Sequence, residues 1–186
     1  PGLRVVMPST VADARDLLIA AVLSPDPVVY IDDRWLYDQT DELDPIVELD
    51  LAREGPRVLA EGTDLTVVGA SYATHLATQA RGELAAAGYS AEVIDLRVLN
   101  PFKPEIIRRS VEKTGRLLVV DGGWKTCGLS AEVIAAVVEG LPSRALIRAP
   151  VRVTLPDAPA PTSRNLESLY YPDVSRVVSA AQSLFK

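Results

Sequence analysis

The sequence predicts a three-layer α/β/α domain with a mostly parallel sheet, and three observations support this fold class. From Thr63 onward, short apolar runs typical of buried strands alternate with runs whose apolar residues recur at helical spacing. Parallel neighbours need crossover connections, and right-handed crossovers place helices on both faces of a sheet. The chain has 186 residues, 48% of them hydrophobic, so it is long enough to bury such a core.

The first 31 residues predict a strand, a helix and a second strand. After a short strand at residues 5–7, Thr10 is of the type that caps a helix, and Asp13 follows three residues later as in a capping box. A Pro-Asp-Pro stretch ends this helix. Residues 28–31 are continuously apolar, which favours a buried strand over a half-exposed one.

Between residues 32 and 62 the periodicity fades. Acidic residues mix there with Pro45 and Pro56, so we expect a linker that is ordered only where another part of the molecule holds it. The chain is therefore expected to comprise three parts, which are residues 1–38, an acidic linker of residues 39–62, and a domain of residues 63–186.

The domain of residues 63–186 is expected to alternate four strands with four helices. In order they are a strand at 65–68, a helix over 73–84 closed by Gly88, a strand at 91–98, a short helix at 104–111 opened by proline, a strand at 116–120, a helix at 129–138, a strand at 151–155, and a last helix capped by Asp173 that runs to Phe185. The proline-rich residues 155–161 are expected to lie extended across a surface.

Composition and charge exclude several classes of function. The formal net charge of −6 opposes binding to nucleic acid, and no cluster of Lys and Arg with interleaved aromatics offsets it. The longest apolar run, Leu17 to Leu23, is too short to span a bilayer. One Cys and one His leave no set for a zinc site and no internal disulfide, which suits a reducing, cytoplasmic location.

The stretch DGGWKTCG, residues 121–128, joins a predicted strand to a predicted helix, where α/β enzymes place their active sites. Cys127 is the only thiol of the chain, and the start of the following helix favours a thiolate. With His75, which also follows a strand, as its base, Cys127 would be the nucleophile of a small cysteine-dependent enzyme. No third residue completes the catalytic set. The alternative is that both residues serve packing or an interface.

Other features near the predicted strand ends carry weaker signals. Trp124, next to glycines, either anchors an interface or covers the edge of the sheet. The turn at residues 69–72 lacks the dinucleotide and P-loop fingerprints, so an ordinary strand-to-helix turn is the simpler interpretation. Asp95 and Asp121 lie too far apart in sequence to predict a carboxylate pair. The residues alone thus indicate an α/β module with suspected interfaces.

Five stretches carry a resemblance to a known family. Four of them are GRLLVVDGGWKTCGLSAEVIAAV at 115–137, AEVIDLRVLNPF at 91–102, APVRVTLPDAPAPTS at 149–163 and EGTDLTVVGASYATHLA at 61–77, and the fifth is PGLRVVMPSTVADARDLLIAAVLSPDPVVYID at 1–32. The first four resemble the C-terminal half of the beta subunits of thiamine-diphosphate-dependent 2-oxo acid dehydrogenases of the pyruvate, branched-chain or acetoin type, which includes a transketolase C-terminal-like domain. The fifth resembles the end of the pyrimidine-binding domain of the same subunits.

The resemblance implies that residues 1–38 are the tail of a pyrimidine-binding domain and that residues 63–186 are the transketolase C-terminal-like domain. Since the chain starts at Pro1 in what reads as a mid-fold strand, we expect a piece of a longer protein. In the family, the missing part carries the catalytic residues and most of the beta-side cofactor pocket. We therefore expect no catalytic, cofactor-binding or metal residue here, and thiamine diphosphate and magnesium only in the complete enzyme.

The resemblance also implies a role in assembly, with a two-fold homodimer through the C-terminal domain and contacts with an alpha subunit and the acyltransferase core. On that basis the interface candidates are His75, Trp124, Cys127, Phe185 and Lys186. Arg148 stands where family members often carry an acidic residue, which disfavours binding to a basic acyltransferase surface. The alternatives are a free-standing interaction module built on this domain and the cysteine-dependent enzyme.

Overall fold

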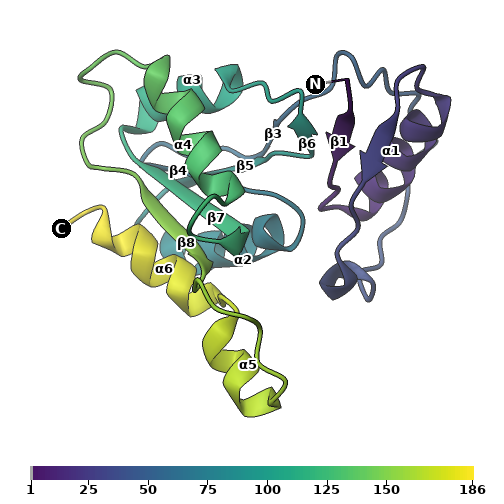
Figure 1. Ribbon diagram of the computed structural model, residues 1–186. Coiled ribbons are helices and arrows are strands. Elements are labelled where there is room, and N and C mark those ends of the chain that lie inside the picture. Colours follow the sequence, from purple (N-terminus) through teal and green to yellow (C-terminus); the bar gives the residue numbers. More distant parts are fainter. Residues whose placement is uncertain (1) are drawn as a thin grey trace.

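The computed structural model describes residues 2–186, and its main sheet has five strands in the order β3-β5-β4-β7-β8. Four strands run parallel, which are β4 (Leu65–Gly69), β5 (Ala91–Asp95), β7 (Leu117–Trp124) and β8 (Val151–Leu155). Strand β3 (Arg57–Ala60) pairs antiparallel with β5 at one edge. The prediction of a mostly parallel sheet is therefore confirmed (Figure 1).

Helices cover both faces of this sheet and complete the three predicted layers. On one face lie α2 (Tyr72–Ala86) and α6 (Val174–Ser183), and on the other lie α3 (Glu105–Thr114) and α4 (Leu129–Glu139). Successive strand residues point to opposite faces, so Leu118 and Val120 of β7 join the core under α2, whereas Leu117 and Val119 join the core under α4. This explains the continuous apolar run in β7.

A smaller sheet holds the N-terminal part beside the main sheet (Figure 1). Its elements are β2 (Val28–Tyr30), β1 (Arg4–Val6) and β6 (Val98–Asn100), in that spatial order, with helix α1 (Val11–Leu23) and the 3-10 turn η1 (Arg34–Leu36) in the same part of the chain. The predicted cap of α1 is confirmed, because Thr10 Oγ1 accepts the backbone N–H of Asp13 at 3.1 Å. Each helix of residues 2–186 is too short or too polar to cross a membrane.

Two predicted strands differ from the structure. Residues 28–31 are not fully buried, since β2 is an edge strand of the small sheet and Val29 is 42% exposed. The predicted strand at 91–98 is interrupted, and its two halves belong to different sheets, as β5 and β6. The interruption occurs at Arg97, whose φ of 50° lies in the left-handed region. The chain therefore passes from one sheet to the other at this residue.

Three elements were not predicted, which are η1, β3 and α5. The segment 39–62, expected to be an acidic linker, contains β3, because residues 57–60 find a partner in β5 that lies far along the sequence. Helix α5 (Arg164–Tyr170) follows the proline-rich stretch and extends away from the sheet in Figure 1. The boundaries at 38/39 and 62/63 stay predictions.

A buried ion-pair cluster joins the N-terminal part to the main sheet. The guanidinium of Arg97 donates to Asp13 Oδ1 of α1 at 2.8 Å and to Glu54 Oε2 at 2.8 Å. Arg57 of β3 pairs with the same Asp13 carboxylate. Next to this cluster, the buried Asp95 carboxylate accepts the hydroxyl of Ser9 and, at 3.1 Å, that of Thr74. The two sheets are thus connected by charged groups as well as by the chain.

Candidate functional site at the carboxyl edge of the sheet

At the carboxyl edge of the sheet, the loops after β4 and β7 lead to opposite faces. Strand β4 is followed by α2 on one face, and its neighbour β7 is followed by α4 on the opposite face. In open α/β sheets such a reversal opens a crevice, and ligands bind there. Residues 121–128 run from the last part of β7 to the start of α4 and therefore lie at this edge, as the sequence predicted.

Asp121 organises that loop. Its buried carboxylate accepts the N–H of Gly123 at 2.8 Å and the N–H of Ser130, in the first turn of α4, at 2.7 Å. An anion at this place is favoured by the free N–H groups and the dipole of the helix. The carboxylate therefore acts as a structural brace between the end of β7 and the start of α4.

Gly128→Ala is expected to lower the free energy of unfolding by about 2 kcal/mol. An added Cβ would lie 2.0 Å from the carbonyl oxygen of Trp124 and 3.0 Å from Asp121 Oδ2, so the loop would have to move. Gly122→Ala is the matched control, since nothing lies within 4 Å of a Cβ at that position. Urea denaturation of both variants measures the difference, and equal stabilities would contradict this loop geometry.

Trp124 is 54% exposed and is held at one end by a hydrogen bond. Its Nε1–H donates to the hydroxyl of Tyr170 in α5 at 3.0 Å, and that hydroxyl donates to the carbonyl of Ala158 at 2.7 Å. Asp157 accepts both the N–H and the hydroxyl of Thr126, at 3.0 and 2.7 Å. These bonds hold the pKa of Asp157 below its ordinary value. The proline-rich stretch thus lies against the 121–128 loop.

Cys127 and His75 are not brought together by any hydrogen bond within residues 2–186. Cys127 is exposed, with a left-handed φ of 56°. His75 lies in the first turn of α2, where its Nε2 accepts from the side-chain amide of Gln79 at 2.9 Å and its ring stacks on Tyr72 at 5.8 Å. The described contacts of His75 are those of a packing residue, and they offer no base for the thiol.

Phe185 and Lys186 lie away from this edge. The Phe185 ring packs 4.3 Å from that of Tyr89, which follows the carboxyl end of α2, and the guanidinium of Arg116 lies 4.4 Å from its centroid. Helix α2 has 15 residues and is therefore about 22 Å long, which separates this end from His75. Lys186 is exposed at the chain end. The five interface candidates therefore fall on two separate regions, and their roles stay predictions.

Within residues 2–186, no group of three or more His, Cys, Asp or Glu side chains is arranged to hold a metal ion. The expectation that thiamine diphosphate and magnesium are bound only in the complete enzyme stays a prediction.

The profile of one protein family, "Transketolase, C-terminal domain", matches residues 56–177. The chain is 38% identical to the beta-1 subunit of the mitochondrial pyruvate dehydrogenase E1 component of Arabidopsis thaliana, covering 98% of this chain and 51% of that protein. It is 38% identical to the corresponding beta subunit of Bacillus subtilis, with coverages of 100% and 57%. The beta subunit of the acetoin:2,6-dichlorophenolindophenol oxidoreductase of Cupriavidus necator is 33% identical, with coverages of 100% and 54%.

Among solved structures, the fold is similar to a split-gene transketolase described as an inactive beta4 tetramer. The TM-score is 0.79 at 26% sequence identity, and the match covers 99% of this chain and 57% of that one. The chain spans about half the length of the curated relatives it matches.

Proposed function

Because the chain belongs to the family of transketolase C-terminal domains, we propose that it is the carboxyl-terminal part of the beta subunit of a thiamine-diphosphate-dependent 2-oxo acid dehydrogenase. The match with beta subunits along 98 to 100% of this chain carries the proposal. The complete enzyme would decarboxylate a 2-oxo acid oxidatively and transfer the acyl group to lipoyl groups. The cofactor and its magnesium would be bound by other parts of that enzyme, in the cytoplasm.

The function of this part is the assembly of subunits. An exposed Trp124 at a braced loop is the kind of aromatic residue that anchors interfaces. The similar split-gene transketolase chain is described as an inactive tetramer of beta chains, so that protein associates with itself without activity. By analogy this chain would pack against a two-fold mate, and the complete subunit would also contact an alpha subunit and the acyltransferase core.

An activity assay with 2,6-dichlorophenolindophenol as the electron acceptor tests the proposal. The isolated chain, supplied with this dye, thiamine diphosphate, Mg²⁺ and pyruvate, a branched-chain 2-oxo acid or acetoin in turn, is expected to give no turnover. The complete Bacillus subtilis beta subunit with its alpha subunit, given pyruvate under the same conditions, serves as the positive control. Turnover by the isolated chain would show that it carries its own active site. Cys127→Ser would then tell whether the thiol supplies that activity.

A further inference from the structure

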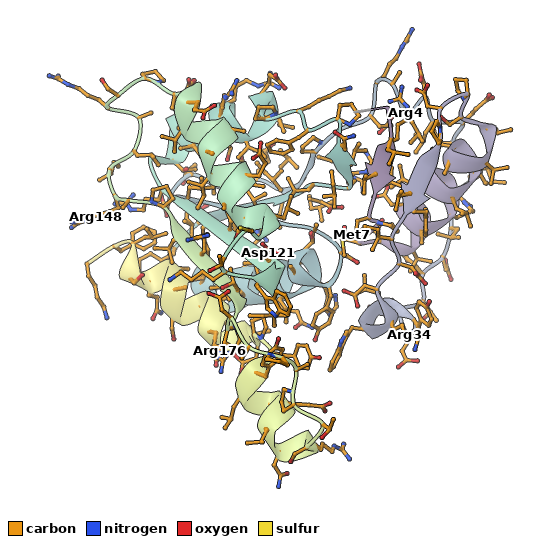
Figure 2. All side chains as sticks on the ribbon, viewed as in Figure 1. Arg4, Met7, Arg34, Asp121, Arg148 and Arg176 are labelled. Atoms are coloured by element: carbon orange, nitrogen blue, oxygen red, sulfur yellow. The ribbon has the colours of Figure 1, made fainter. Side chains whose placement is uncertain are left out.

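A cavity of about 750 Å³ lies at the carboxyl edge of the sheet. Its walls come from the N-terminal part, the start of α2, the end of β7 and α5 with the start of α6. Leu99 of β6, Leu129 of α4 and Leu155 of β8 also line it. Met7 of the N-terminal part and Asp121 at the end of β7 both line it, and both are labelled in Figure 2. The volume lies in the range of small-molecule sites, and the position is the reversal point described above.

Three aromatic rings form one side of this cavity. The ring of Trp35 in η1 lies 5.4 Å from that of Tyr72 in α2 and 5.7 Å from that of Tyr171 after α5. Although its ring packs against the other two, Trp35 is 59% exposed. Aromatic faces attract cations within about 6 Å, and they also pack against flat apolar groups. This wall is therefore suited to a ligand with a flat body and a positive charge.

The charged groups that line the cavity are mostly negative, which is the sign complementary to a cationic ligand. Among residues 2–186 these groups are the four carboxylates of Asp33, Asp121, Glu167 and Asp173 and the guanidinium of Arg164. Asp33, Asp121 and Asp173 each accept a backbone N–H at the start of a helix or 3-10 turn, but the negative charge remains. Neither Asp33 nor Glu167 takes part in an ion pair within the described chain. Excess negative charge on low-dielectric walls attracts cations.

We propose that this cavity binds a small organic cation with a flat apolar body, which stacks on the exposed ring of Trp35, beside Tyr72 and Tyr171, and pairs with Glu167 and Asp33. The charge balance disfavours an anion, and the aromatic wall distinguishes the ligand from a simple metal ion or a fully hydrated amine. The proposal rests on the cavity alone and does not depend on the function proposed above.

Calorimetric titration of the chain with phenyltrimethylammonium tests this. Saturable binding at one site per chain is expected, and benzyl alcohol and benzoate, as neutral and anionic probes, are expected to bind at least about tenfold more weakly. Trp35→Ala is expected to weaken binding about tenfold, and Glu167→Gln about fivefold. Glu112→Gln, exposed on α3 away from the cavity, is the matched control and should leave the affinity unchanged.

Circular dichroism of each variant establishes that it folds, and Trp35→Phe, which keeps an aromatic face, should retain more of the affinity than Trp35→Ala. The proposal is overturned if phenyltrimethylammonium gives no saturable heat, if benzyl alcohol binds as tightly, or if neither the Trp35 nor the Glu167 variants change the affinity.

Discussion

Arg97→Met is expected to lower the free energy of unfolding by about 4 kcal/mol. Arg97 is only 5% exposed and connects Asp13 of α1 with Glu54 before β3. Asp13 is itself only 3% exposed, so loss of the guanidinium leaves a buried carboxylate with Arg57 as its remaining ionic partner. Removing one partner of a buried pair costs more than the pair contributes, because the other charge stays desolvated.

Urea denaturation measures this loss, and two further variants identify its cause. Arg53→Met removes an exposed arginine that pairs only with Asp50, and is expected to change the stability by less than about 0.5 kcal/mol. Adding Asp13→Asn to Arg97→Met removes the stranded charge and should recover part of the stability. A loss below about 1 kcal/mol for Arg97→Met would contradict a cluster that joins the two sheets.

Asp95→Asn is expected to raise the stability near neutral pH by up to about 3 kcal/mol. Burial raises the pKa of Asp95 from its ordinary 3.8 to about 6, against the hydrogen bonds from Ser9 and Thr74. The nearby Asp13 carboxylate raises this pKa further, and the guanidinium of Arg57 lowers it. The folded chain therefore carries an unfavourable buried charge above that pKa.

The sign of the pH dependence follows from the raised pKa. Between about pH 4 and pH 6 the Asp95 carboxyl binds more protons in the folded state than in the unfolded state, so its contribution to the stability should fall as the pH rises. The difference between Asp95→Asn and the native chain should be small near pH 4 and reach its full size above pH 6. Denaturation across this range measures it, with Glu112→Gln as the exposed control. If the difference in stability between Asp95→Asn and the native chain did not depend on pH, the raised pKa of Asp95 would be refuted.

Local signals predicted the elements that depend on local interactions. Thr10 was identified as a cap because a side chain of its type bonds to an N–H three residues away, and that bond is present. Strand β8 was predicted with the residues it has, and its sequence VRVTL alternates apolar and polar residues, as is typical of a partly buried strand. For a helix cap, the bonding partner lies within a few residues of the side chain. For a strand of this kind, burial against the core is enough to favour the structure.

The missed features depend on partners far along the sequence. The break at Arg97 accompanies bonds to residues 43 and 84 positions away, and β3 is a strand only through its pairing with β5. In the candidate site, a strand-to-helix connection at residues 121–128 was predicted, but the strand was expected to end at Val120, whereas β7 continues through Gly122 and Gly123 to Trp124. The bond from Trp124 to Tyr170 was not predicted either, because no local pattern connects them. The aromatic wall of the cavity is likewise assembled from three distant segments.

Sedimentation equilibrium of the isolated chain tests whether this chain serves the assembly of subunits. A reversible dimer or larger assembly is expected at high protein concentration, and Trp124→Ala should weaken the association about tenfold or more while leaving the fold intact. A chain that sediments as a monomer at every concentration, with or without Trp124, would contradict this role in assembly.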